Sequence, residues 1–142
     1  MTFHVFIGYG DVQAKTIAKN LGHYLRRFGM STFVASTDPA WMLPGSNVNQ
    51  IYQRLRISDI LIAVCTSNTQ PTSKLGKEIR FARANKMPVL PFLENGMTPP
   101  FGLHMDWYMT FDLQKPWTQH RAVATYVLWQ IEKSMEAVAQ II

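Results

Sequence analysis

Two short segments of the chain carry residues whose types and spacing could do chemistry. In the first, F-H-V-F-I-G-Y-G-D over residues 3–11, an apolar run ends at Gly8-Tyr9-Gly10 immediately before a helical pattern begins. Such a junction of strand, glycine-containing turn and helix is where α/β proteins often receive a phosphate. The second segment, T-S-K-L-G-K-E-I, carries the acid Glu78. Together the two segments predict a candidate pocket and a candidate acid.

The best-known nucleotide and catalytic motifs are incomplete in this sequence. A dinucleotide-binding G-x-G-x-x-G that began at Gly8 would need a third glycine where the chain has Gln13. A phosphoryl receiver needs an aspartate at the end of the third strand, where the chain has Cys65-Thr66. Neither a P-loop nor a G-x-S-x-G elbow is present. The histidines lack metal-ligand spacing (His4, His23, His104 and His120), so we expect no bound metal and no resident cofactor.

The position of Glu78 on its predicted helix leaves two interpretations open. The apolar stripe of this helix is expected to face the core through Leu75, Ile79 and Ala82. Glu78 falls about 60° from the centre of that stripe, in the second turn, and points towards the carboxyl edge of the sheet. It could be a catalytic acid there. Alternatively it could form a surface ion pair with Lys74 or Lys77, worth at most about a few tenths of a kcal/mol.

Alternating apolar runs and helical patterns predict the fold. Strands are expected at residues 3–8, 31–35, 59–66, 88–93 and 108–111. Helices are expected at residues 11–28, over about ten residues after position 47, and at residues 73–86 and 117–142. This order predicts a single α/β domain over residues 1–142, with a flavodoxin-like five-stranded parallel sheet (order 2-1-3-4-5) and helices on both faces. Prolines in P-V-L-P-F-L place the fourth strand near a sheet edge.

The first helix illustrates the signals on which this prediction depends. Asp11 is a suitable N-cap, because its side chain can accept a hydrogen bond from a backbone N–H of the first turn, and Gly29 is a suitable stop. The apolar positions of this segment recur with a helical period: Val12, Ile17, Ala18, Leu21, Tyr24, Leu25 and Phe28.

In a sheet of this order, ligands bind beyond the carboxyl ends of the first and third strands. The turn Gly8-Tyr9-Gly10 and the segment from Thr66 onwards are both expected there. Glycine would allow the backbone to approach a ligand closely, and Tyr9 offers a ring and a hydroxyl. The residues alone are equally compatible with a tight turn in which Tyr9 is a half-buried cap.

Composition and charge exclude several classes of function. The chain has 142 residues, 47% apolar and 16% charged, which is ordinary for a globular protein, and no apolar run could span a bilayer. The formal net charge of +5 comes from scattered lysines and arginines without a basic stripe, so nucleic acid is not an expected partner. The single cysteine, Cys65, and the lack of a signal-peptide pattern favour a cytoplasmic location.

Six segments in register resemble the Toll/interleukin-1 receptor (TIR) domain family. They keep the order and spacing of that family from about residue 3 to residue 96: V-F-I-G-Y-G-D, F-G-M-S-T-F-V, L-P-G-S-N, S-D-I-L-I-A-V-C-T, S-K-L-G-K-E-I and M-P-V-L-P-F. The last third of the chain is similar only in outline. The resemblance implies a flavodoxin-like fold and one of two activities. Many members, including prokaryotic stand-alone ones, cleave the nicotinamide–ribose bond of NAD⁺, whereas others are non-catalytic adaptors that act by TIR–TIR association.

For an enzymatic member, the resemblance implies a role for several residues. The family places one catalytic glutamate in the third helix, and the pattern S-x-x-x-x-E from Ser73 puts Glu78 at that position. Gly8, Tyr9 and Gly10 would form the floor of the NAD⁺ pocket. NAD⁺ is then a substrate, and the product would be ADP-ribose or a cyclic isomer. The implied setting is immune or antiviral signalling, in which a downstream effector could read the nucleotide product.

The loop after the second strand resembles the family's BB loop, which lies beside the pocket and contacts a neighbouring protomer. Here Trp41–Pro44 predicts a surface for self-association into an oligomer, unless its large apolar side chains form a lid over the core. Trp41 is also a candidate aromatic wall of the pocket. Asp38 is a candidate replacement for the acid that many members carry where this chain has Ala35. Lys74 stands where enzymatic members often have tryptophan, and it could contact a phosphate or lie in solvent.

A single carboxylate is chemically sufficient for the reaction that the resemblance implies. Ordinary glycoside hydrolysis needs two carboxyl groups, because the alcohol that leaves must be protonated. Nicotinamide in NAD⁺ is already cationic at its ring nitrogen and leaves as a neutral molecule. An ionised Glu78, at an unperturbed pKa of about 4.3, could stabilise the oxocarbenium-like transition state and hold a ribose hydroxyl. A nucleoside-base transferase of similar topology is a third interpretation.

Overall fold

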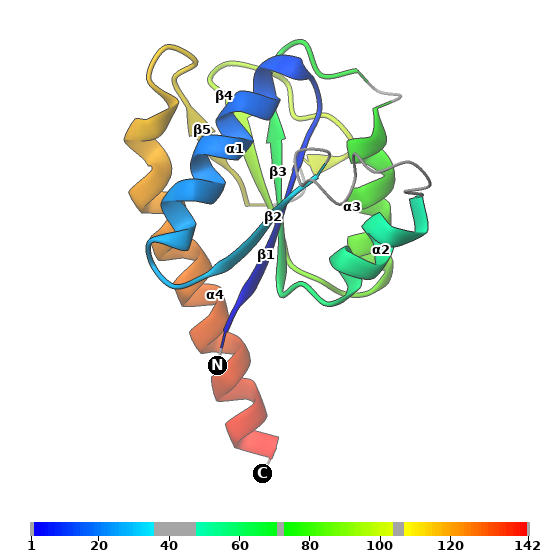
Figure 1. Cartoon of the computed structure of the whole chain (residues 1–142), viewed down its shortest axis with the longest axis vertical. Coiled ribbons are helices and arrows are strands. Elements are labelled where there is room, and N and C mark those ends of the chain that lie inside the picture. Colours follow the sequence, from blue (N-terminus) through cyan, green and yellow to red (C-terminus); the bar gives the residue numbers. More distant parts are fainter. Residues whose placement is uncertain (1, 36–47, 71–72, 104–106, 142) are drawn as a thin grey trace.

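The structure is a computed structural model that describes residues 2–35, 48–70, 73–103 and 107–141 (Figure 1). Its strands are β1 (His4–Tyr9), β2 (Ser31–Val34), β3 (Ile60–Cys65), β4 (Val89–Glu94) and β5 (Met109–Phe111). Its helices are α1 (Val12–Arg26), α2 (Val48–Arg56), α3 (Lys74–Ala84) and α4 (His120–Ile141), with the 3₁₀ turn η3 (Pro116–Gln119) directly before α4. The predicted alternation of strands and helices is confirmed.

The five strands form one parallel sheet in the order β2-β1-β3-β4-β5, which confirms the predicted flavodoxin-like topology. β1 lies between β2 and β3, and its last residue, Tyr9, is in register with Val64 of β3. The carboxyl ends of β1 and β3 therefore meet at the same edge of the sheet, where the order of the strands reverses. In sheets of this kind a ligand crevice opens at that point.

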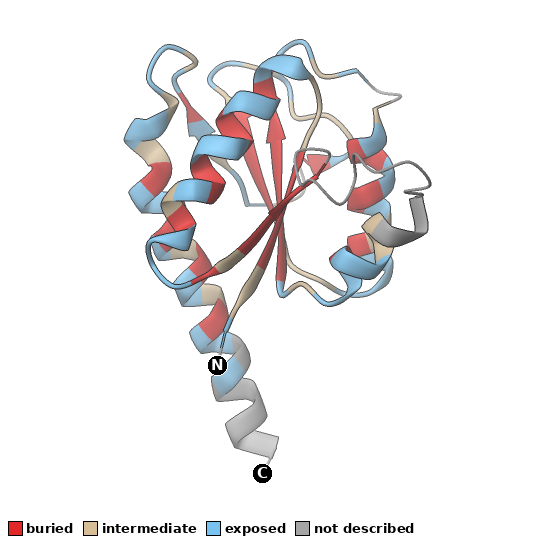
Figure 2. Ribbon diagram, in the orientation of Figure 1, coloured by how far each residue is buried: buried red, intermediate tan, exposed pale blue. Residues whose placement is uncertain are grey.

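Helices cover both faces of the sheet, with α1 and α4 on one face and α2 and α3 on the other (Figure 1). Figure 2 shows buried residues concentrated in the strands and on the sides of the helices that face them. β3 is buried along its whole length, as expected for a central strand covered on both faces. Two apolar cores result: Leu21 and Val127 belong to the first, and Leu55 and Leu75 to the second.

The N-terminus of α1 is capped as predicted. Asp11 Oδ1 accepts a hydrogen bond from the Ala14 N–H at 2.9 Å. After the helix the chain turns through Gly29, whose φ of +81° favours glycine. Val12 and Phe28, the first and last positions of the apolar pattern, are 84% and 51% exposed. Both lie at the ends of the helical pattern, where its apolar stripe no longer faces the sheet.

β1 extends beyond the predicted residues 3–8 by one residue, to Tyr9. The N–H of the next residue, Gly10, still donates a hydrogen bond of 3.0 Å to the carbonyl of Val64. The turn into α1 therefore consists of little more than Gly10 and Asp11. Glycine does not end the strand here, because the buried backbone groups of a central strand must find partners in the neighbouring strands.

β4 is the second strand from the β5 edge, in agreement with the prolines in its sequence. Pro91 is in register with Ala63 of β3, whereas β5 pairs only from Phe92 to Glu94. The pairing with β5 thus starts one residue after the proline that lacks an N–H.

α4 is the longest helix of the described chain, with 22 residues. It packs into the first core through Val123, Val127 and Ile131. Its outer side exposes Trp129, over which Lys133 Nζ lies at 4.3 Å from the ring centre. Across the described ranges, no helix is at once long enough and apolar enough to cross a membrane.

Candidate active site

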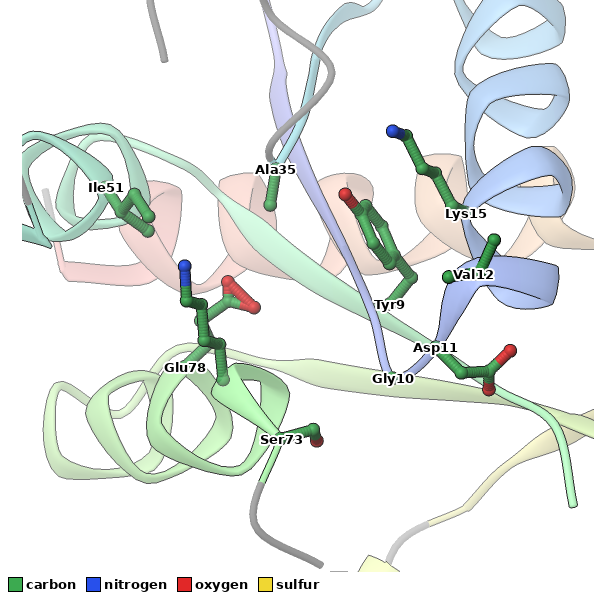
Figure 3. A pocket seen from close by; sticks show the side chains of 10 residues that line it. Tyr9, Gly10, Asp11, Val12, Lys15, Ala35, Ile51, Ser73 and Glu78 are labelled. Carbon is green, nitrogen blue, oxygen red and sulfur yellow. The ribbon is translucent and has the colours of Figure 1, made fainter. Parts of the chain in front are cut away.

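A cavity of about 320 Å³ lies at the carboxyl edge of the sheet, between the first turn of α1 and the start of α3 (Figure 3). The β1–α1 junction contributes Tyr9, Gly10, Asp11, Val12 and Lys15 to its lining. The start of α3 contributes Ser73, Lys74 and Glu78, and Ala35 and Ile51 complete the walls. Its size falls within the range of small-molecule sites.

Glu78 is a buried acid whose carboxyl group points into this cavity (Figure 3). Only 5% of its surface is exposed. The carboxyl group lies against the backbone of Gly8, where a Cβ would be 2.9 Å from Glu78 Oε1 and 2.8 Å from Leu75 Cδ1. Glycine at position 8 is therefore what lets the acid approach β1 so closely. Within the described part of the chain, no hydrogen bond reaches the Glu78 carboxyl, which leaves it available to a ligand.

Burial controls the ionisation of Glu78. Desolvation raises the pKa of its carboxyl to about 8, and the positive charge of Lys74, one turn earlier, offsets part of this effect. The expectation of an ionised Glu78 with an unperturbed pKa is therefore wrong, because most of the carboxyl is protonated at neutral pH. The alternative of a helix-surface ion pair with Lys74 or Lys77 does not apply either, because the acid is buried.

Three further residues predicted for the pocket line the cavity together with Glu78 and Lys74: Tyr9, Gly10 and Ser73. The Tyr9 ring stands on the α1 side, across from Glu78 (Figure 3). Gly10 packs so closely on Thr69 that a Cβ would collide with the threonine side chain. Ser73 is the N-cap residue of α3, and its Oγ is buried with no hydrogen-bond partner among the described residues. This hydroxyl is therefore available to a ligand.

Two other residues predicted for the pocket, Thr66 and Gly8, do not line the described cavity. Thr66 is fully buried behind the β1–α1 turn, where its Oγ1 donates a hydrogen bond of 2.6 Å to Asp11 Oδ2. Gly8 lies beneath Glu78 and supports it. Asp38 and Trp41, with the rest of the predicted self-association loop, lie outside the described residues.

Asp11 is a structural acid at the rim of the cavity. Its carboxylate accepts hydrogen bonds from the Ala14 N–H at 2.9 Å, from Thr66 Oγ1 at 2.6 Å and from Thr69 Oγ1 at 2.9 Å. Desolvation opposes its ionisation, but these hydrogen bonds outweigh that effect and hold the pKa of Asp11 below its ordinary value. Asp11 therefore joins the start of α1 to the end of β3 and is already engaged within the protein.

Five residues that line the described cavity were not predicted for the pocket from the sequence: Asp11, Val12, Lys15, Ala35 and Ile51. Lys15 lies four positions after Asp11, so it projects from the first turn of α1 at the predicted ligand edge. That spacing is the signal that could have found it. Ile51 of α2 is half-buried at the wall of the cavity. Val12 gave no signal, because an apolar side chain in a helical pattern predicts burial.

The cavity combines one buried carboxyl, a tyrosine, a serine hydroxyl and two lysines. Such groups can stabilise a developing positive charge or transfer a proton, and they can hold sugar hydroxyls and an anionic group. In the ranges that the structure describes, no group of three or more His, Cys, Asp or Glu side chains could hold a metal ion.

Solved structures with a similar fold include an enzyme and two kinds of signalling domain. The chain is similar to the Clostridium botulinum CMP N-glycosidase BcmB, with a TM-score of 0.62 and 21% identity over 87% of this chain and 98% of that one. A signal receiver domain from Vibrio parahaemolyticus has a TM-score of 0.57 and 10% identity over 98% of both chains. The TIR domains of the activated Roq1 resistosome have a TM-score of 0.52 and 14% identity over 99% of this chain and 86% of that one. At these identities the likenesses show a shared fold.

Sequence comparison adds the family. No curated protein is a significant match to the chain. The family model described as TIR domain matches residues 5–127, a range that includes every residue lining the cavity. The sheet topology agrees with this match. The chain therefore belongs to the TIR domain family.

Proposed function

We propose that the protein is an NAD⁺ nucleosidase that cleaves the bond between nicotinamide and ribose, with Glu78 as the catalytic residue. The observation that carries this proposal is a buried acid beside a cavity. Glu78 is only 5% exposed, yet it lines an open cavity at the end of β1. Membership of the TIR family supports it. The likeness to a protein named as a CMP N-glycosidase supports cleavage of an N-glycosidic bond on this fold.

The cationic nicotinamide ring of NAD⁺ suits a carboxyl group with a raised pKa. Burial gives Glu78 a pKa of about 8, so that it is mostly neutral at pH 7. A pyridinium ring beside it would favour the ionised form and lower that pKa. Binding of NAD⁺ would thus release a proton and leave a carboxylate facing the ribose.

Cleavage then requires no general acid, because nicotinamide leaves as a neutral molecule. As the C–N bond lengthens, positive charge develops on the ribose. The Glu78 carboxylate stabilises this charge and accepts a hydrogen bond from a ribose hydroxyl, an effect of about 3–4 kcal/mol. Attack of water on the anomeric carbon, with loss of a proton, converts NAD⁺ and water into ADP-ribose, nicotinamide and a proton. Attack by the adenine or ribose of the substrate itself gives a cyclic isomer.

Other residues at this edge are proposed to position the substrate. Tyr9 offers its ring to the nicotinamide, and Gly10 allows close approach of the backbone. Ser73 Oγ, which has no partner within the described ranges, would hydrogen-bond a ribose hydroxyl. Asp38 and Trp41 remain predicted pocket residues from the loop after β2.

The raised pKa of Glu78 also favours a second candidate, hydrolysis of a pyrimidine nucleoside monophosphate. A pyrimidine base is a poor leaving group until it is protonated, and a carboxyl with a pKa of about 8 carries the required proton at pH 7. The nucleotide and water would then give the free base and ribose 5-phosphate. The likeness to a CMP N-glycosidase points in the same direction.

One experiment separates the two candidates. The wild-type protein is incubated with NAD⁺ or with CMP, at increasing protein concentrations and with a crowding agent, and free nicotinamide and cytosine are measured by chromatography. We expect nicotinamide from NAD⁺, at a rate that does not fall above about pH 8, where Glu78 is ionised. Release of cytosine alone, at a rate that falls above that pH, would favour the second candidate. If neither nicotinamide nor cytosine were released, the remaining function would be that of a non-catalytic adaptor.

We also propose that self-association through the segment around Trp41–Pro44 completes the active site, in an immune or antiviral system whose effector reads the nucleotide product. The likeness to TIR domains of a resistosome supports an assembly role. The expected result is that turnover per protein molecule rises with protein concentration, and that Trp41→Ala abolishes this rise while the chain stays folded. Turnover that is independent of concentration would contradict the assembly role.

A further inference from the structure

Two lysines line the cavity on opposite sides. Lys15 projects from the first turn of α1, next to Tyr9, and Lys74 belongs to the first turn of α3. Figure 3 shows the Lys15 ammonium group on the α1 side of the cavity, across from the Glu78 carboxyl. Only the charge of Lys74 acts on the pKa of Glu78, so the two cations have different tasks.

The charge of Lys74 lowers the pKa of Glu78. Lys74 precedes Glu78 by one helical turn, and its charge favours the ionised carboxylate. A phosphate bound at Lys74 would bring a second negative charge beside the carboxylate that must ionise. Lys74 is therefore a poor place for an anionic part of the substrate.

Lys15 has no such task within the protein. The nearest acid in sequence, Asp11, accepts three hydrogen bonds from Ala14, Thr66 and Thr69. Among the described residues, no hydrogen bond or ion pair involves the Lys15 ammonium group, and only the backbone N–H of this residue donates, to the Asp11 carbonyl at 3.0 Å. While Glu78 is protonated, the charged groups that the described residues contribute to the lining are Lys15, Lys74 and Asp11, two positive and one negative. This described part of the lining is thus net positive, which favours an anionic ligand.

The shape of a nucleotide decides where its anionic group must lie. The glycosidic carbon C1′ and the carbon C4′, which carries the 5′-phosphate through C5′, lie on the two sides of the ribose ring oxygen. If the glycosidic carbon faces Glu78, as the proposed function requires, the phosphate lies on the far side of the cavity, where Lys15 is. A compact ammonium group on a flexible stem is a common phosphate ligand.

We propose that Lys15 binds the phosphate on the ribose 5′-oxygen, so that the site selects nucleotides over free nucleosides. This inference rests on the proposed function only for the placement of the ribose. The phosphate can belong to the pyrophosphate of a dinucleotide or to a mononucleotide, because both carry a phosphate ester at that oxygen.

Binding to the Glu78→Gln variant tests the inference without turnover. Calorimetric titration with nicotinamide mononucleotide and with nicotinamide riboside compares two ligands that differ only in the phosphate. We expect the mononucleotide to bind about tenfold or more tightly than the riboside. Adding Lys15→Gln should weaken mononucleotide binding by about the same factor and leave riboside binding unchanged.

Lys19 is the matched control, since it is an exposed lysine one turn further along α1 that does not line the cavity. Adding Lys19→Gln should change neither affinity. The inference would be overturned if the two ligands bound with equal affinity or if neither bound. It would also be overturned if the preference for the phosphate were lost with Lys74→Gln instead of Lys15→Gln.

Kinetics of the otherwise wild-type protein give a second measurement. Lys15→Gln should raise the KM for NAD⁺ about tenfold with little change in kcat, and Lys19→Gln should leave both unchanged. A fall in kcat with an unchanged KM would contradict phosphate binding by Lys15. If the wild-type protein releases no nicotinamide, the proposed function fails, while the preference measured with Glu78→Gln still decides the role of Lys15.

Discussion

The ionisation of Glu78 is coupled to the stability of the whole fold. The folded chain raises its pKa from the ordinary value of 4.5 to about 8. Between these two pH values the folded chain holds a proton that the unfolded chain has released. The stability contributed by protonated Glu78 is therefore fully present below about pH 4.5 and is lost as the pH rises to about 8.

Glu78→Gln is expected to remove this pH-dependent loss, because glutamine stays neutral. At about pH 9 the free energy of unfolding of the variant should exceed that of the wild type by about 2–4 kcal/mol, and at about pH 4 the two should nearly agree. Chemical denaturation at both pH values measures the difference. A gap that is the same at both would show that Glu78 titrates normally in the folded chain.

Gly8 determines whether Glu78 can occupy its place. A Cβ at Gly8 would lie 2.9 Å from Glu78 Oε1, so Gly8→Ala should displace the acid, lower turnover at least tenfold and destabilise the fold by about 1–3 kcal/mol. Gly22→Ala is the control, since this glycine is also buried and a Cβ there would lie 3.0 Å from Val34 Cγ2, between α1 and β2. Both variants should lose stability in thermal unfolding, but only Gly8→Ala should lose turnover. Wild-type turnover in Gly8→Ala would contradict the close approach.

The junction between β1 and α1 depends on Asp11, which caps the helix and binds two hydroxyls at the end of β3. Because hydrogen bonds hold its pKa below the ordinary value, its contribution to stability is present above about pH 4 and is lost as the pH falls below that value. Asp11→Ala should therefore destabilise the protein by about 1–3 kcal/mol at pH 7, and by less at about pH 3. Asp11→Asn, which can still cap the helix, should lose less. Urea titrations of the three proteins test this, and an unchanged midpoint for Asp11→Ala would refute it.

The elements of the fold could be predicted because each has a periodic apolar pattern and a capping signal. The Asp11 cap and the continuous apolar run of β3 are local features, and they placed α1 and the central strand correctly. The burial of Glu78 is not local, since the periodicity of α3 alone leaves this residue beside the apolar stripe. It is buried because Gly8, on a distant strand, has no side chain to keep it out.

The lining of the cavity could likewise be predicted only where the signal is local in the sequence. Tyr9, Gly10 and Ser73 lie in recognisable turn and cap positions, and reasoning from the sequence brought them to the correct edge. Lys15 and Ile51 line the cavity because of how α1 and α2 are turned against the sheet, which depends on tertiary packing. A sequence pattern shows which side of a helix is apolar, but it does not show which polar residue borders a ligand.

At the scale of the whole molecule, the sheet separates two cores, and only one of them supports the acid. Leu75 and Leu21 are both fully buried leucines, the first in the α2–α3 core and the second in the α1–α4 core. Truncation of either to alanine should destabilise the protein by about 2–5 kcal/mol. Leu75→Ala should also reduce turnover at temperatures where both variants are folded, because Leu75 packs against Gly8 beside Glu78. Equal turnover in both variants would show that the packing around Leu75 does not position the acid.

The most direct test of the account is the rate of nicotinamide release from NAD⁺ by Glu78→Gln relative to the wild type. Both proteins are compared at the same high concentration, after circular dichroism has shown that both are folded. The account predicts that the variant loses about a hundredfold or more in turnover, because glutamine cannot supply the negative charge that the ribose requires. A variant that releases nicotinamide as fast as the wild type would contradict it.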